Sequence, residues 1–369
     1  MIMVLMTLDH VRHYLSLPDA DPLDLTHTTT AWFMTRWVTH FCAPVFVFLA
    51  GTGAFLAGSR GMTKKQLSWF LLTRGLWLVL LELTLIRFIL IPDISYSFVL
   101  LSVIWAIGWS MVVLALLVHF PPGVITFIAA TMIAGHNLAD GVSPESFGSF
   151  AWLWNILHVP GMIHPFGERT EIYVMYPLIP WIGVMACGYA LGRVLQLDQR
   201  TRKKRLLVIG FAAIVAFIVL RAGNFYGDAV HWSQQETIGW SALSFINTTK
   251  YPPSLLFLLM TLGPAMIALA VFDRGAPKLL RPILVFGRVP LFFYILHFML
   301  IHLIAVALAY IRYSDISWWL QFDGFPADYG YSLPVIYAIW IGVVAALYLP
   351  CRWFAGVKQR NRSAWLSYL

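Results

Sequence analysis

Ten apolar stretches that suit membrane-spanning helices constrain this chain more than any other feature. Two of them, 1–16 and 122–137, are short, and the second could be re-entrant. Charged residues make up only 11% of the 369 positions, whereas a soluble domain carries roughly 25%. An apolar helix of about 20 residues crosses the hydrocarbon core and satisfies its own backbone hydrogen bonds there. The sequence therefore predicts an all-α polytopic membrane helix bundle, a single domain over residues 1–369 with about ten transmembrane helices. We place these helices near residues 1–16, 34–58, 72–92, 97–118, 122–137, 173–195, 205–222, 252–272, 283–311 and 333–353.

Positive charge is concentrated in alternate loops. Most of the 25 Lys and Arg residues lie in one set of loops, where only Asp198 and Asp273 oppose them. The positive-inside rule makes this side cytosolic and places both termini in the cytosol. The net charge of +8 then reflects orientation in a lipid bilayer, and we expect no nucleic-acid partner. We interpret the basic run at 200–205 as a topology anchor in preference to a lipid-phosphate site.

The three cysteines do not indicate a metal site or a disulfide framework. Cys42, Cys187 and Cys351 all lie in apolar stretches, where cysteine behaves as a small core residue. No Cys/His spacing typical of metal binding is found, so we expect no metal cofactor.

Four ionisable residues interrupt the first apolar helix: Asp9, His10, Arg12 and His13. Ionisable groups at membrane depth cost about 2.5–3.5 kcal/mol each, so they usually mark a pathway or a reaction centre. On a helix, Asp9 shares a face with Arg12 and His13, which lie three and four residues later. This spacing predicts a charge-compensated trio that leaves His10 available for chemistry.

A second polar group opens the next span. Arg36 and His40 lie one turn apart on one helix face, and an antiparallel connection would bring them to the depth of Asp9. Snorkelling at the membrane interface is an equally good interpretation of both residues. Further along, Tyr294 and His297 share a face of the ninth span, and Lys250 begins the eighth span on the outer side.

The available chemistry is histidine supported by a carboxylate, which suits general-base activation of a hydroxyl or an amine. The sequence contains no nucleotide-binding loop, zinc signature or serine-hydrolase elbow. The same buried charges would also suit a proton relay in a non-enzymatic transporter or lipid-handling protein. Against that alternative, we find no inverted repeat of broken helices.

Several segments resemble one family when they are taken in order: Leu5-Met6-Thr7-Leu8-Asp9-His10, Phe46-Val47-Phe48-Leu49-Ala50-Gly51, Leu72-Thr73-Arg74-Gly75-Leu76-Trp77, Asn247-Thr248-Thr249-Lys250-Tyr251-Pro252-Pro253-Ser254-Leu255 and Phe286-Gly287-Arg288-Val289-Pro290-Leu291-Phe292. The set is similar to the catalytic domain of heparan-alpha-glucosaminide N-acetyltransferase, and more closely to bacterial membrane proteins grouped with it. The resemblance implies a transmembrane acyltransferase of the bacterial cytoplasmic membrane.

The resemblance also implies roles for particular residues. The wider superfamily carries a histidine at the end of its first helix, which His10 matches, preceded by an arginine that has no counterpart here. We therefore expect the first helix to be truncated at its cytosolic end. The family enzyme also has a histidine in the loop that enters the second span and an asparagine in the first helix. An ungapped count places that histidine at Thr30 of this chain, with His27 nearby, and that asparagine at Asp9.

The leading hypothesis is acyl transfer from cytosolic acyl-CoA, most simply acetyl-CoA, to a hydroxyl or amine of a sugar or glycan on the outer side. His10 would act as general base, Asp9 would fix its charge and tautomer, and Arg36 would stabilise the oxyanion. His40 would complete this catalytic group. A homodimer is compatible with the hypothesis. The expected CoA-binding residues are Arg74, Arg193 and Arg288, and the expected substrate-binding residues are His27, Lys250, Tyr294 and His297.

Overall fold

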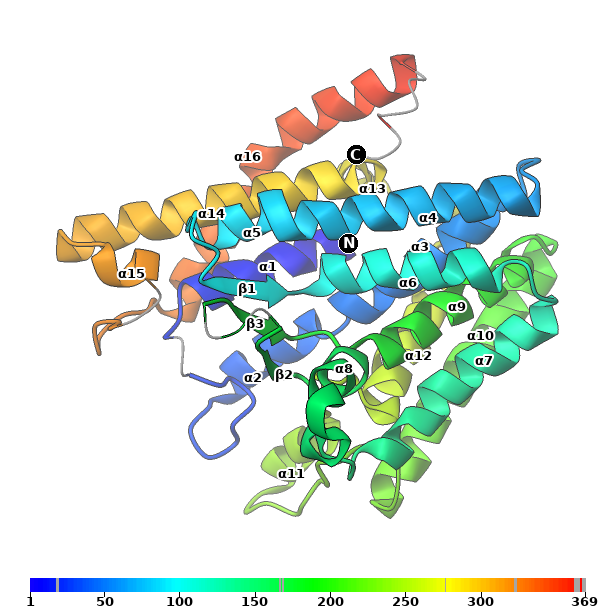
Figure 1. Cartoon of the computed structure of the whole chain (residues 1–369), viewed down its shortest axis with the longest axis horizontal. Coiled ribbons are helices and arrows are strands. Elements are labelled where there is room, and N and C mark those ends of the chain that lie inside the picture. The colour runs from blue at the N-terminus through cyan, green and yellow to red at the C-terminus, as the bar shows by residue number, and fades with distance from the viewer. Residues whose placement is uncertain are drawn as a thin grey trace. The chain divides into compact units, whose positions relative to one another are not determined.

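The protein is almost entirely helical (Figure 1). The computed structural model describes residues 1–17, 20–165, 167, 169–275, 277–321, 324–361 and 366. Within these residues, 8 helical stretches are long and apolar enough to cross a membrane: Thr30–Gly58, Lys64–Leu90, Pro122–Ala139, Leu178–Leu195, Gln199–Gly223, Leu255–Arg274, Pro290–Tyr313 and Leu333–Arg360. These helices confirm the all-α polytopic bundle, and the chain is an integral membrane protein.

The two other predicted spans are also helical but shorter. They are α1 (Ile2–Tyr14), with 13 residues, and α6 (Val103–Leu117), with 15 residues. At a rise of about 1.5 Å per residue, neither helix alone reaches the roughly 30 Å of a hydrocarbon core.

The chain divides into two compact units, which we describe separately. The N/C unit comprises Met1–Cys42, Ile86–Ile94 and Ala276–Leu369, and the central unit comprises Ala43–Leu85 and Ser95–Gly275.

In the N/C unit, α1 packs against two long helices from the end of the chain, α14 (Pro290–Tyr313) and α16 (Leu333–Arg360). The indole Nε1 of Trp340 donates to the carbonyl of Val4 at 2.8 Å, which fastens α16 to α1. The unit also contains α2 (Thr30–Thr39), α5 (Arg87–Leu90), α13 (Leu284–Arg288) and α15 (Ser317–Gln321).

The predicted span at 283–311 is interrupted in the structure. It consists of the short α13 followed by α14, and the break falls at Arg288, Val289 and Pro290. Proline is favoured in the first turn of a helix because it has no N–H to donate, so Pro290 begins a new helix instead of continuing α13.

The central unit is built on packed helix pairs, in which α10 lies along α12, α4 along α6, and α9 beside both α6 and α7. Its elements are α3 (Cys42–Gly58), α4 (Lys64–Leu81), η1 (Glu82–Ile86), β1 (Phe98–Leu101), α6, α7 (Pro122–Gly135), η2 (His136–Ala139), η3 (Pro144–Phe150), α8 (Ala151–Leu157), β2 (Gly161–Ile163), β3 (Glu171–Val174), α9 (Leu178–Leu195), α10 (Gln199–Gly223), α11 (Ile238–Ile246), α12 (Leu255–Val271) and η4 (Phe272–Arg274).

A small sheet in the central unit is not predicted by the sequence. Strand β3 pairs with β1 in parallel and with β2 antiparallel, so the strand order is β1-β3-β2. The prediction places all of β1 and the last two residues of β3 at the starts of the spans at 97–118 and 173–195. A short apolar run has no periodicity that separates a strand from a helix, which explains the wrong assignment.

Close contact between α3 and α9 depends on two glycines. A Cβ atom on Gly51 would overlap the carbonyl of Met185, and one on Gly188 would overlap the carbonyl of Phe48. Thr52 Oγ1 donates to the Gly188 carbonyl at 3.0 Å across the same contact. Small residues allow membrane helices to approach closely enough for such interhelical hydrogen bonds.

We expect Gly51→Ala to lower the free energy of unfolding by about 1–3 kcal/mol, because the added methyl forces the α3 and α9 backbones apart. Gly53→Ala is the matched control on the same helix, since a Cβ there meets nothing within 4 Å. The control should be neutral, or stabilising by up to about 1 kcal/mol. Thermal unfolding in detergent measures both variants, and equal melting temperatures would contradict the close-contact role of Gly51.

Candidate active site

Two histidines from distant parts of the sequence meet inside the N/C unit. His10 lies on α1 and His297 on α14, and His10 Nδ1 is 2.7 Å from His297 Nε2. His297 is fully buried, and its Nδ1 lies 3.0 Å from the carbonyl oxygen of Phe293. A carbonyl can only accept, so in the neutral pair His297 carries its proton on Nδ1 and accepts from His10 Nδ1–H through Nε2. This assignment leaves the lone pair of His10 on Nε2.

Aromatic side chains of α14 surround the histidine pair. The ring of Phe298 lies 4.1 Å from that of His10, and Tyr294 meets His10 edge-on at 6.5 Å. Both aromatic residues are buried. Tyr294 and His297, which the sequence placed on one helix face, therefore lie beside His10 as part of one site.

Asp9 is the centre of a charged network next to His10. Its Oδ1 accepts from Arg12 Nη2 at 3.1 Å, from Arg36 Nη1 at 2.7 Å and from Thr39 Oγ1 at 2.9 Å. The side chains of Asp9 and Arg36 are each 13% exposed and that of Arg12 is 6% exposed. Asp9 therefore forms ion pairs with two guanidinium groups. Charged side chains at membrane depth are usually paired in this way, because an isolated charge there is costly.

The structure confirms two of the predicted proximities. The pairing of Asp9 with Arg12 and the approach of Arg36 to Asp9 are as expected. His13, the third member of the predicted trio, is exposed, and its role in compensating Asp9 stays a prediction. The hydrogen-bond partner of His10 Nδ1 is His297, in the position that we predicted for Asp9.

His40 lies at the end of α2, where its backbone N–H donates to the carbonyl of Trp37 at 3.0 Å. Its side chain is fully buried. The structure therefore places His40 in the interior of the N/C unit and not at an exposed interfacial position.

A cavity of about 490 Å³ opens in the N/C unit just beyond the end of α1. His27 lies on its wall, largely exposed, with Nδ1 2.8 Å from Asp24 Oδ2. Hydrogen bonds from Thr26 and His27 lower the pKa of Asp24 to about 2. The cavity is lined by Ser16, Leu17, Ala20, Asp21, Pro22, Asp24, His27, Thr28, Thr29, Trp32, Tyr329, Gly330 and Tyr331.

Lys250 lies in the central unit, in a loop held by the buried carboxylate of Asp228. That carboxylate accepts from the backbone N–H and hydroxyl of Thr249 and from the hydroxyl of Ser254, at 2.6–2.9 Å. Lys250 is 8% exposed, and its Nζ lies 5.1 Å from the centre of the Tyr251 ring. The structure thus places Lys250 in a different unit from His10.

The three arginines expected to meet CoA are also divided between the units. Arg74, partly buried on α4 with its guanidinium 5.7 Å from the Phe70 ring, and Arg193, exposed at the end of α9, belong to the central unit. Arg288 is exposed at the end of α13 in the N/C unit.

The sequence did not single out a basic cavity on the central unit. This cavity, of about 790 Å³, places four cationic side chains beside the apolar surface of α10. The run at 200–205, interpreted above as a topology anchor, therefore contributes to a concave surface. The lining residues are Gln199, Arg200, Lys203, Lys204, Leu207, Val208, Phe211 and Arg274.

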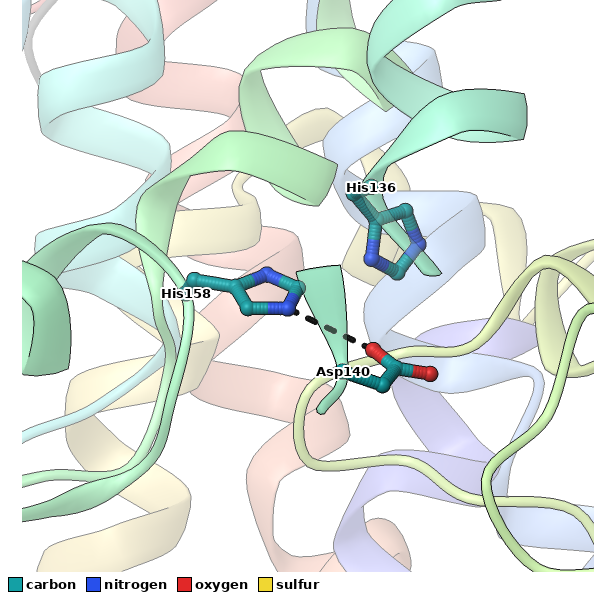
Figure 2. Close-up of side chains that lie close together, drawn as sticks. All are labelled: His136, Asp140 and His158. Carbon is teal, nitrogen blue, oxygen red and sulfur yellow. Dashed lines mark ion pairs between the residues drawn. The ribbon is translucent and has the colours of Figure 1, made fainter. Parts of the chain in front are cut away.

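A second group missed by the sequence consists of His136, Asp140 and His158, whose ligand atoms all lie within 4.8 Å of one another (Figure 2). The available signal was the four-residue spacing of His136 and Asp140 at the end of an apolar helix. His158 comes 18 positions after Asp140, beyond a second helix, so local spacing did not connect it to the other two.

Comparison with known proteins identifies one family. The family model described as heparan-alpha-glucosaminide N-acetyltransferase, catalytic, matches residues 1–224. The matched region includes Asp9, His10, Arg36 and His40 and ends before α14. No curated protein and no solved structure matches the chain.

Proposed function

The chain belongs to the family of the heparan-alpha-glucosaminide N-acetyltransferase catalytic domain, and from this membership we propose that it transfers an acetyl group across the membrane. The family is one of membrane acetyltransferases, which implies an acyl-CoA co-substrate. In our proposal acetyl-CoA is the donor on the cytosolic side, and a sugar hydroxyl or amine on the outer side is the acceptor. The observation that carries the proposal is the hydrogen bond between His10 and His297 beside the Asp9 network.

His10 acts as the general base through Nε2. Because His10 Nδ1–H donates to His297, the lone pair on Nε2 can accept the proton of an acceptor O–H or N–H. The acceptor oxygen or nitrogen forms a bond to the thioester carbonyl carbon, and the C–S bond then breaks. The thiolate of CoA takes the proton from His10, which returns the histidine pair to its starting state. His297 is a positioning residue, since its own proton is held by the Phe293 carbonyl.

Arg36 stabilises the negative charge that develops on the thioester oxygen. A guanidinium group has five N–H donors, and Nη1 of Arg36 donates to both carboxylate oxygens of Asp9. Asp9 and Thr39 fix the position of the guanidinium before the reaction, as electrostatic stabilisation of an oxyanion requires.

The cavity beside His27 is the proposed entry for the sugar acceptor. Ser16 on its wall follows the last residue of α1, Tyr14, by two residues. Tyr14 packs against Phe298, whose ring also contacts His10. The lining offers Asp21, Asp24, His27 and aromatic rings, which are suitable groups for binding a hydroxyl-rich ligand.

An isotope assay tests the proposal. The purified chain in lipid vesicles is given acetyl-CoA labelled in the acetyl group, together with a panel of amino sugars and glycans. Transfer of label to an acceptor, with release of CoA, supports the enzyme. Unchanged acetyl-CoA with every acceptor, accompanied by proton flux across the vesicles, would favour the transporter interpretation of the buried charges.

CoA presents a pyrophosphate and a 3′-phosphate, which a membrane protein must meet with cations. We expect charge removal at Arg74, Arg193 and Arg288 to weaken acetyl-CoA binding more than charge removal at Lys203 and Lys204. The loss should be larger for acetyl-CoA than for an acetyl-pantetheine thioester, which lacks those phosphates. Binding titrations on the purified variants in detergent measure both ligands.

Two outcomes of these titrations would change the assignment. Equal losses for the two ligands would show that the three arginines support the fold and not the phosphates. A larger loss from Lys203 and Lys204, which line the basic cavity with Arg200 and Arg274, would move the phosphate site to that cavity.

A further inference from the structure

Three side chains of the central unit converge from two short segments. His136 begins η2 at the end of α7, Asp140 follows η2, and His158 follows α8. Figure 2 shows them turned toward one another, with His158 Nε2 3.3 Å from Asp140 Oδ1. Their ligand atoms all lie within 4.8 Å of one another.

The two histidines are buried without normal hydrogen bonds. His136 is 6% exposed and His158 is 1% exposed. Within the described part of the chain, none of their ring nitrogens meets the geometry of a hydrogen bond, although His158 Nε2 lies 3.3 Å from Asp140 Oδ1 and the Pro253 carbonyl lies near His136. Buried polar atoms are nearly always satisfied, so two such imidazoles, each with one ring nitrogen near the same carboxylate, call for a ligand.

The carboxylate is oriented by a second residue. Asn137 Nδ2 donates to Asp140 Oδ2 at 2.8 Å, which leaves Oδ1 facing His158. Asn137 is itself fixed, because its Oδ1 accepts from the backbone N–H of Leu255 at 2.9 Å. Partial burial would raise the pKa of Asp140, but the close contact with His158 and the hydrogen bond from Asn137 outweigh it and hold the pKa below its ordinary value.

We propose that His136, Asp140 and His158 bind one divalent transition-metal ion at the end of α7. Two imidazoles and one carboxylate are ligands that suit ions such as Zn²⁺, whereas Mg²⁺ and Ca²⁺ prefer oxygen-only sites. Tetrahedral zinc with bonds of about 2.0–2.1 Å places its ligand atoms about 3.3 Å apart. The pair formed by His158 and Asp140 already has that separation, and the ligand atom of His136 lies within 4.8 Å of both.

The ion would link two segments of the central unit. It would connect η2 to the end of α8 and, through Asn137, to the first residue of α12. Three protein ligands leave one position of a tetrahedral ion for water or for a further ligand. Asp140 is the most accessible of the three side chains, with 21% exposure.

Metal titration of the purified full chain tests this site directly. The protein in detergent is treated with a chelator, the chelator is removed, and Co²⁺ is added as a visible probe that Zn²⁺ then displaces. We expect one Co²⁺ per chain. His136→Gln and His158→Gln should each weaken binding at least 100-fold, Asp140→Asn at least tenfold, and Asn137→Ala about tenfold. Zn²⁺ should raise the melting temperature of the wild type but not that of the ligand variants.

His164→Gln is the matched control, because His164 is an exposed histidine in the segment after β2 of the same unit. It should bind Co²⁺ as the wild type does. If the histidine variants fail to fold, Asp140→Asn preserves side-chain size and keeps the test decisive. A wild type that binds neither Co²⁺ nor Zn²⁺, or an Asp140→Asn protein with wild-type affinity and stoichiometry, would overturn the proposal.

Discussion

His10→Ala should lower the rate of acetyl transfer by about 10²–10⁴-fold, the usual contribution of a positioned general base. The loss corresponds to about 3–5 kcal/mol in the activation free energy, at 1.36 kcal/mol per factor of ten. The reason is geometric: His10 Nδ1 is hydrogen-bonded to His297, so Nε2 is the nitrogen that can accept the acceptor proton. Single-turnover transfer from labelled acetyl-CoA measures the effect without interference from product release.

His13→Ala is the matched control for this prediction. It removes an exposed histidine from the same helix, three positions away, and should change the rate by less than twofold. His297→Ala tests the positioning role of His297 apart from the catalytic role of His10. It leaves His10 in place but removes the hydrogen-bond acceptor that holds the tautomer of His10. That variant should lose turnover mainly through kcat and shift the pH profile. Wild-type turnover in purified, folded His10→Ala would rule out the general-base role.

The sequence predicted those parts of the fold and site that depend on local spacing. Apolar length located the membrane helices, and the three-residue spacing of Asp9 and Arg12 predicted a salt bridge that the structure contains. Antiparallel packing of the first two spans also predicted that Arg36 approaches Asp9. The catalytic and binding roles assigned to these residues remain predictions.

The remaining features depend on packing between segments far apart in the chain. His10 and His297 are separated by 287 positions, and no local period relates α1 to α14. The group formed by His136, Asp140 and His158 depends in the same way on how α8 folds back toward η2. The strands β1 and β3 were missed for a related reason, since a four-residue apolar strand next to a membrane helix has the composition of that helix.

Asp9→Ala should lower the free energy of unfolding by about 3–5 kcal/mol, because it leaves two largely buried guanidinium groups without their shared carboxylate. Asp24→Ala is the matched control in the same unit. It removes an exposed carboxylate that pairs with His27 and accepts hydrogen bonds from Thr26, and we expect a loss of no more than about 1 kcal/mol. Thermal unfolding in detergent compares the two variants.

A double variant tests whether the loss arises from unpaired charge. In Asp9→Ala combined with Arg12→Met, one of the two stranded cations is replaced by an apolar side chain of similar length. The double variant should therefore be more stable than Asp9→Ala alone, since residues in one charged network couple non-additively. Strictly additive losses would show that Asp9 and Arg12 stabilise the protein independently.

Asp9→Asn retains Oδ1 as an acceptor for Thr39 and Arg36, so it should destabilise the protein less than Asp9→Ala does. It should still slow acetyl transfer, because the neutral amide holds Arg36 less firmly in place.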